Sequence, residues 1–232
     1  AAAVHHVLDD GWMWQLRFDD DTVSAGFVVD RNRVSLSASA TELWERQMQR
    51  FPFLQKQFAN ANVVRPTDGL SVSGRLQRLT TQAADANWAV LPNTAGFIDP
   101  LHSTGIAHTL FGVKRLAKIL QADVSATSRR KQLDDYSRRT IDEIRLVDTL
   151  VEGCYAALPS FSLWCDWCML YFVAVTSMEQ SDAGPDDSFL QAADGDFRSV
   201  VADARRELQR AIVGGRSGSA CRRFRGWLRQ AI

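Results

Sequence analysis

The chain has 232 residues, of which 46% are hydrophobic and 23% charged, so it is long enough to bury a core, and we expect a folded chain rather than general disorder. Lysine plus arginine and aspartate plus glutamate number 27 each, so no net field attracts nucleic acid or an anionic membrane. We therefore expect a small molecule or a soluble protein as the partner.

The sequence shows no run of about 18 apolar residues, so we predict no membrane span. The first residues, AAAVHHVLDDG, lack the basic and apolar regions of a signal peptide and pass almost directly into strand-like sequence. The four cysteines, at positions 154, 165, 168 and 221, are unevenly spaced. This pattern favours reduced thiols, no structural disulfide and a cytoplasmic protein.

The first half of the chain is expected to contain the strands. Apolar residues alternate on either side of three consecutive aspartates, which indicates a hairpin of two antiparallel strands. Thr41 is the expected N-cap of a helix, and Pro52 should end it before a second helical segment. In chain order, we expect a hairpin over 6–29, helices over 42–50 and 53–61, strands over 70–80 and 87–91, and a helix over 104–120.

The second half is expected to be helical. The helix expected over 161–176 is apolar nearly all round and should be buried. The basic segment Arg216–Arg229 is interpreted as a solvated amphipathic helix, with contact to nucleic acid or a membrane as alternatives. The expected helices cover 134–158, 161–176, 188–212 and the terminal segment, with a loop over 181–187.

This distribution predicts an α+β fold. An antiparallel sheet, a ligand-facing loop and a helix would occupy residues 1–121, and an α-helical region would occupy residues 122–232.

The segment LPNTAGFIDPLHSTGIAHT, residues 91–109, is unusual for generic structure. A strand ends at Pro92, the chain turns through glycine and proline, and Ser103-Thr104-Gly105 opens a helix. The first amides of a helix and its positive dipole end favour an anion, or an oxygen that accumulates negative charge. Gly105 would allow close approach of a flat ligand.

The run Gly96-Phe97-Ile98-Asp99-Pro100-Leu101 with Ser103-Thr104-Gly105 resembles the C-terminal flavin motif of flavin-dependent halogenases and related monooxygenases, a "GDAA…DPxxSxG" pattern. Trp12-Met13-Trp14 resembles the front of the halogenase "WxWxIP" motif. The two motifs occur in the family's order, and the resemblance covers about residues 5–121.

The resemblance implies that the loop wraps the flavin ring and that amides at the start of the following helix lie near the flavin. It implies FAD as the cofactor and a small organic molecule as the substrate, with a flavin reductase as a possible partner. The candidate cofactor-binding residues are Asn93, Asp99, Pro100, Ser103, Thr104 and Gly105. The candidate substrate-side residues are Trp12, Trp14 and His102.

The sequence also departs from the family's pattern. Asn93 stands where the family usually has an aspartate expected to bond a ribityl hydroxyl, and Leu16-Arg17 stands in place of Ile-Pro. No GxGxxG follows a strand, although related flavoproteins place their pyrophosphate there. We therefore expect the C-terminal part of an FAD-dependent oxidoreductase that needs a missing N-terminal FAD-binding domain and binds FAD poorly alone. The alternative is a non-enzymatic binding or scaffolding module.

Other candidate sites have simpler interpretations. Cys165 and Cys168 have CxxC spacing, but no second pair or nearby histidine in the sequence completes a zinc site, so we predict core cysteines and no metal. A redox role is the alternative. For His102 and His108 a polar contact is expected, with proton transfer as the alternative.

Overall fold

The computed structural model describes residues 3–35, 38–180 and 188–232. It divides the chain into two units, Ala1–Arg75 and Leu76–Ile232. Small antiparallel sheets precede a helical C-terminal region, which confirms the α+β class. The boundary that we predicted at residue 121 falls inside the second unit, because the helices before and after it pack together.

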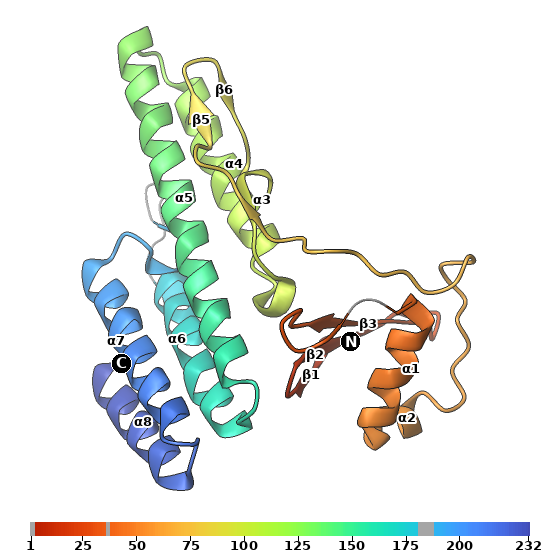
Figure 1. The fold of residues 1–232 in the computed structure, drawn as a ribbon. Helices are drawn as coiled ribbons and strands as arrows, with labels where there is room; N and C mark the ends of the chain where they lie inside the picture. The colour runs from red at the N-terminus through yellow and green to blue at the C-terminus, as the bar shows by residue number, and fades with distance from the viewer. Residues whose placement is uncertain (1–2, 36–37, 181–187) are drawn as a thin grey trace. The chain divides into compact units, whose positions relative to one another are not determined.

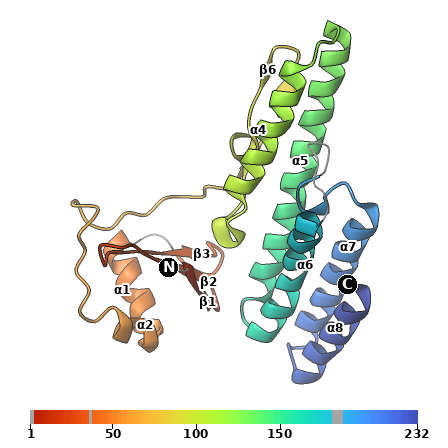
Figure 2. The ribbon, with the colours of Figure 1, turned by 180° about the vertical axis from the view of Figure 1, so that it is seen from behind.

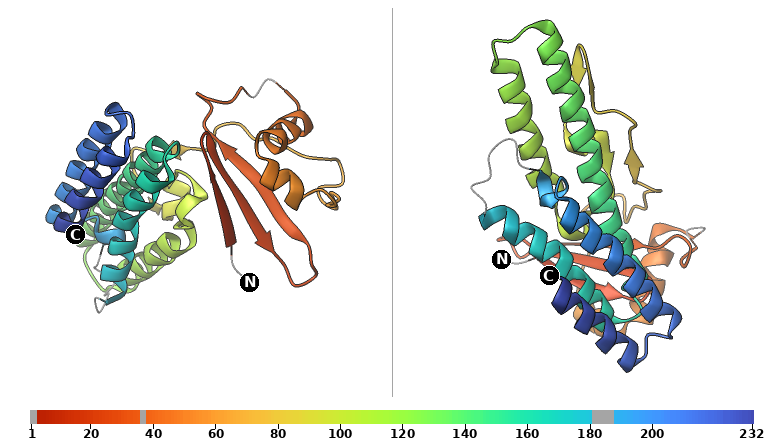
Figure 3. Two further views of the ribbon diagram at one scale, coloured as in Figure 1. Left: turned by 90° about the horizontal axis from the view of Figure 1, so that it is seen from below. Right: turned by 90° about the vertical axis from the view of Figure 1, so that its left-hand side faces the viewer.

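The first unit contains a three-stranded antiparallel sheet in the order β1-β2-β3 (Figure 3). The strands are β1 (Ala3–Leu8), β2 (Gly11–Arg17) and β3 (Val23–Val29). The predicted hairpin corresponds to β2 and β3, while β1 is a third strand that we had not separated from it. The central position of β2 places Trp12 opposite Val7 on one side and Val28 on the other.

Two helices, α1 (Ala40–Arg50) and α2 (Pro52–Gln57), complete this unit. Ser39, rather than Thr41, is the N-cap of α1, because the Glu42 side chain lies three residues later and closes a capping box with it. Pro52 ends the first helix as predicted and begins the second. The core consists of Leu8, Met13, Met48 and Leu54, with aromatic residues packed around it.

The strand predicted over 70–80 is wrong except at its end. Only β4 (Arg78–Leu79) is a strand, and it pairs with β7 (Gly96–Phe97). Val72 and Leu76 are exposed in a segment without regular structure. Alternation of apolar residues does not reveal whether a partner strand is available, and a strand without a partner leaves its backbone groups unpaired.

The second unit is organised around the long helix α5 (Figures 1 and 2). Its first part holds a short hairpin, a one-turn helix, a 3-10 turn and a longer helix that runs along α5. These elements are β5 (Ala84–Asp85), β6 (Trp88–Ala89), α3 (Pro92–Ala95), η1 (Pro100–His102) and α4 (Gly105–Gln121). The strand predicted over 87–91 is thus reduced to the two residues of β6.

The remaining helices pack against α5 and against one another. They are α5 (Ala126–Ala157), α6 (Phe161–Gln180), α7 (Gly195–Val213) and α8 (Gly218–Ala231), with η2 (Phe189–Gln191) before α7. Helix α5 begins eight residues earlier than predicted, because Ser125 caps it and its first turns carry charged rather than apolar residues. The predicted loop over 181–187 lies outside the described residues.

Helix α6 is not buried all round. Leu163, Trp167 and Leu170 are buried, while Phe161 and Phe172 are more than half exposed, at 66% and 54%. By length and composition alone, α6 is the one helix in the described part of the chain that is long and apolar enough to cross a membrane. It also makes specific bundle contacts, since the Trp167 indole donates to the Leu150 carbonyl at 2.7 Å.

The terminal helix α8 is amphipathic, as predicted. Phe224 and Leu228 are buried, and its arginines lie on the other faces. Arg225 donates to the Asp166 carboxylate of α6 at 2.8 Å and to the Ser162 hydroxyl at 2.8 Å. The basic terminal segment therefore contributes both apolar and ionic contacts to the helical unit.

Candidate flavin-facing pocket and the cluster beside it

A pocket of about 410 Å³ lies where the chain passes from β7 through η1 into α4. All six predicted cofactor-binding residues line it. Its other lining residues are mostly apolar and include Phe97, Ile98, Ile106, Leu110, Ile144 and Val147. The sequence motif therefore folds into a concave site with apolar walls and a few polar groups, the usual character of a small-molecule pocket.

The loop between β7 and α4 is held by hydrogen bonds of Asp99. One carboxylate oxygen accepts from the Leu101 amide at 2.8 Å, and the other accepts from the Tyr155 hydroxyl of α5 at 2.7 Å. After η1, Ser103 adopts a left-handed conformation with φ 52° and ψ 30°, which is uncommon for a residue other than glycine. Asp99 and Ser103 thus shape the turn that presents the start of α4.

The start of α4 is open toward the pocket. Within the described chain, the side chain of its N-cap Thr104 makes no capping hydrogen bond, so the first amides have no intrahelical or side-chain cap acceptor. A Cβ atom added at Gly105 would meet only Asn93, with Oδ1 at 3.4 Å. The predicted Asn93, Thr104 and Gly105 therefore come together at one end of the pocket.

A buried carboxylate fixes α4 beneath the pocket. Glu143 of α5 is 1% exposed and accepts hydrogen bonds from Arg115 at 2.6 and 2.8 Å. It also accepts from the Phe189 amide at 2.8 Å and lies 2.9 Å from His108 Nε2. His108 lines the pocket, and its ring stacks on the Phe189 ring with centroids 4.6 Å apart. The polar contact expected for His108 is thus the one with Glu143 of α5, and the stacking adds a contact with η2.

This network holds a charge inside the unit. Burial alone raises the pKa of Glu143, but hydrogen bonds from His108 and Arg115, together with the charge of Arg115, outweigh burial and lower this pKa below its ordinary value. Sequence reasoning missed Glu143 and Arg115. A signal was present, because His108 and Arg115 lie seven residues apart on one helix face, and Glu143 interrupts the apolar face of α5.

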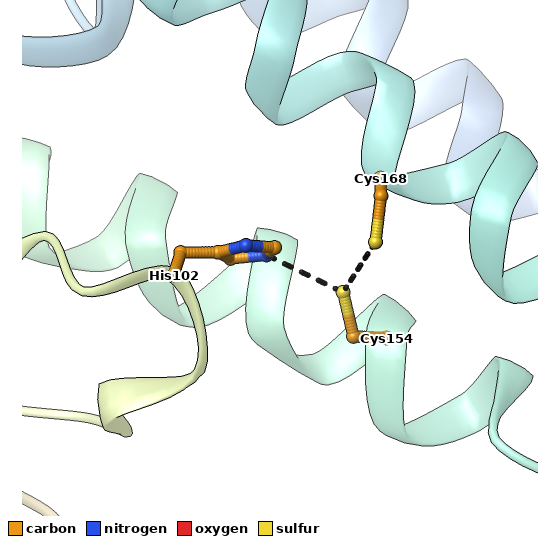
Figure 4. A group of neighbouring side chains, drawn as sticks. All are labelled: His102, Cys154 and Cys168. Carbon is orange, nitrogen blue, oxygen red and sulfur yellow. Dashed lines mark hydrogen bonds between the residues drawn. The ribbon is translucent and has the colours of Figure 1, made fainter. Parts of the chain in front are cut away.

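His102 lies beside the pocket and contacts Cys154, which in turn contacts Cys168 (Figure 4). Its Nε2 atom is 3.4 Å from Cys154 Sγ, and that sulfur is 3.8 Å from Cys168 Sγ. The three ligand-capable atoms lie within 4.8 Å of one another. The hydrogen bond with Cys168 and burial raise the pKa of the Cys154 thiol well above its ordinary value, so this thiol is a poor nucleophile at neutral pH.

The structure does not pair the CxxC cysteines as a unit. Cys165 is half-buried and is not part of the cluster, while Cys168 contacts Cys154 of α5. All four cysteines are free thiols. The sequence could not indicate the cluster of His102, Cys154 and Cys168, because these residues come from η1, α5 and α6.

The other substrate-side candidates, Trp12 and Trp14, lie on β2 of the first unit, with ring centroids 6.2 Å apart. Trp12 is buried, and Trp14 packs so closely over Gly26 that a Cβ atom there would lie 2.1 Å from its ring. Both rings therefore have structural contacts within their own unit, and their role toward a substrate stays a prediction.

Comparison with known proteins identifies the family. The family profile described as tryptophan halogenase matches residues 4–157. The chain belongs to the tryptophan halogenase family. The match includes the Trp-Met-Trp motif and the entire pocket-forming loop, so the resemblance seen in these motifs is confirmed as a family relationship.

Two curated halogenases are similar in sequence. Tetracycline 7-halogenase of Kitasatospora aureofaciens is 26% identical over 246 residues, covering 91% of this chain and 42% of that enzyme. Monodechloroaminopyrrolnitrin halogenase PrnC of Pseudomonas fluorescens is 28% identical over 172 residues, covering 69% of this chain and 29% of that enzyme. The chain thus spans less than half the length of these relatives.

Solved structures show the same fold. Halogenase PltM matches all of this chain with a TM-score of 0.80 and 21% identity, and this chain covers 51% of it. A structure of PltM in complex with phloroglucinol and FAD matches with a TM-score of 0.79. The fold of this chain therefore also occurs in a halogenase that has been solved in complex with FAD.

Proposed function

We propose that this chain forms the flavin-facing and substrate side of an FAD-dependent halogenase that modifies a small organic molecule. The observation that carries the proposal is the convergence of Asn93, Asp99 and Ser103–Gly105 on one pocket at the open start of α4. The family membership of residues 4–157 supports it.

The residues present fit a flavin ring. The apolar side chains of Phe97, Pro100 and Leu110 offer walls for a flat ring, and the amides from Gly105 onward offer donors to an edge that carries negative charge. When bound, reduced flavin with oxygen supplies the oxidising chemistry, while the protein supplies position and electrostatics. Asn93 would take the place of an aspartate as acceptor for a ribityl hydroxyl, and as an amide it accepts more weakly.

Helix α4 carries an apolar stripe that continues from the pocket. Ile106 and Leu110 line the pocket and are 80% and 57% exposed, and Val113 and Leu120 extend the stripe along the helix. Contiguous exposed apolar surface of this kind marks an interaction site. In the proposed enzyme, a nucleotide-binding portion outside these residues would hold the FAD pyrophosphate and cover this stripe.

The proposal is tested on the protein translated from the complete reading frame that encodes this chain. We expect it to bind FAD and, with reduced flavin and oxygen, to form a product whose mass contains a halogen only when chloride or bromide is present. Product that gains oxygen regardless of halide would indicate a hydroxylase. Protein that is colourless after incubation with excess FAD and removal of the unbound cofactor would refute the flavin proposal.

A matched pair of variants tests the pocket itself. Gly105 and Gly195 are each the first residue of a long helix, α4 and α7, and a Cβ atom at Gly195 would meet nothing within 4 Å. Gly105→Val should weaken FAD binding by at least about tenfold, because a loss of only about 1.4 kcal/mol of binding free energy lowers the affinity by that factor. Gly195→Val should leave FAD binding unchanged. Equal affinities for both variants would place the flavin elsewhere.

A further inference from the structure

We propose that His102, Cys154 and Cys168 bind a zinc ion, through the imidazole Nε2 atom and two thiolate sulfurs. The inference rests on the described geometry of the second unit and is independent of the flavin proposal. Nothing in the sequence spacing indicates the site, because its ligands are 52 and 14 residues apart along the chain.

Two of the three distances within the cluster match those of a tetrahedral zinc site. With Zn–S bonds of about 2.3 Å and a Zn–N bond of about 2.1 Å, tetrahedral angles place two sulfurs about 3.8 Å apart and a sulfur and a nitrogen about 3.6 Å apart. The structure has 3.8 Å between the two sulfurs and 3.4 Å between Cys154 Sγ and His102 Nε2. The third pair lies within 4.8 Å, so a small side-chain rotation completes the triangle.

The His102 ring points toward the sulfur of Cys154 (Figure 4), and Tyr171 helps to hold it there. The imidazole stacks on the Tyr171 ring with centroids 4.2 Å apart and an interplanar angle of 10°. The Tyr171 hydroxyl also donates to the His102 carbonyl at 3.1 Å. The stacking and the fixed backbone thus limit the orientations that the His102 ring can adopt.

The charge of the loaded site suits its burial. Cys154 and Cys168 are 0% and 4% exposed, and an uncompensated charge there would be costly. When Zn²⁺ binds, two Zn–S bonds form and the two thiol protons leave to the solvent, so the ion and its two thiolates together are neutral. His102 is half-buried, which leaves water access to the fourth coordination position.

Zinc at this site would tie the pocket loop to the helical bundle. His102 lies between Pro100 and Ser103, both of which line the pocket, whereas Cys154 belongs to α5 and Cys168 to α6. The ion would therefore join these three segments at one point and reduce the freedom of the loop that shapes the pocket.

The test is a Co²⁺ titration of the reduced, metal-free chain of residues 1–232 without oxygen. We expect one Co²⁺ per chain, with a thiolate-to-cobalt charge-transfer absorption and the strong visible bands of a tetrahedral site, both removed by Zn²⁺. We expect at least about a 100-fold loss of Co²⁺ affinity in each of three variants, Cys154→Ser, Cys168→Ser and His102→Gln. This exceeds the loss usually caused by changing residues that only hydrogen-bond to metal ligands. Cys165→Ser and Cys221→Ser are the matched controls and should bind as the unchanged chain does.

X-ray absorption of the zinc-loaded, unchanged chain provides a second measurement that does not depend on whether the variants fold. It should give two sulfur ligands, one imidazole nitrogen and one further light atom. Absence of the charge-transfer band, or a band that persists when Cys154 and Cys168 are both serine, would overturn the proposal. A reduced chain that binds no metal and forms a Cys154–Cys168 disulfide in air would overturn it as well.

Discussion

Replacing Glu143 with glutamine should destabilise the second unit strongly. The substitution keeps the size of the side chain but removes the charge that accepts two hydrogen bonds from Arg115, which is itself only 5% exposed. The buried guanidinium would then lose the carboxylate that accepts these two hydrogen bonds. Breaking a buried ion pair from one side costs about 3 to 5 kcal/mol.

Urea unfolding followed by far-ultraviolet circular dichroism measures this loss. With a slope of about 2 kcal/mol per molar urea, the transition of the helical unit should move down by about 1.5 to 2.5 M. The matched control is Glu152→Gln in the same helix, because Glu152 pairs with Arg205 at an exposed site, with 55% and 56% of the two side chains accessible. Exposed pairs contribute about 0 to 1 kcal/mol.

The effect of Glu143→Gln should also depend on pH. The pKa of Glu143 is lowered in the folded state from its ordinary 4.5, so its contribution is present above that value and is lost as pH falls through the folded pKa. The stability difference between the unchanged chain and the variant should therefore be constant near neutral pH and shrink below about pH 4.5. A loss at neutral pH no larger than that of Glu152→Gln would refute the reasoning.

Two further pairs of substitutions test the packing of the second unit and the helix cap of the first. Gly153→Ala places a Cβ atom 2.0 Å from the Trp167 ring and should lower the free energy of unfolding by more than about 2 kcal/mol. The control is Gly226→Ala in α8, where a Cβ atom would meet nothing within 4 Å and the change should be neutral or stabilising. Equal urea midpoints for the two variants would contradict the packing of α5 against α6. Ser39→Ala removes the cap of α1 and should lower the stability of the helix by about 1 kcal/mol, while Thr41→Ala should lower it far less. Amide hydrogen exchange of α1 measures both effects. A larger effect at Thr41 would contradict the observed cap.

Sequence patterns predicted the helices best. Apolar residues at helical spacing located α4 through α8 because each of these helices buries one face in the same unit. They placed boundaries poorly where charged residues begin a helix, as at Ala126. They also failed at 70–77, where alternation is present but none of the described residues forms a partner strand.

The pocket was predictable because one continuous segment supplies most of it. Asn93 through Gly105 carry the turn, the helix start and the glycine within a few residues, so the motif could be read from the chain directly. The Glu143 network and the His102 cluster were not predictable in the same way. Their members come from helices whose relative rotation depends on the packing of the whole unit.

The most direct test of the central claim is amide hydrogen exchange of the complete protein with and without FAD. If the loop and the start of α4 face the flavin, FAD should slow exchange at the amides of Thr104, Gly105, Ile106 and Ala107, whose positions at the helix start leave them without intrahelical acceptors. FAD binding that protects other segments and leaves these four amides unchanged would contradict the account.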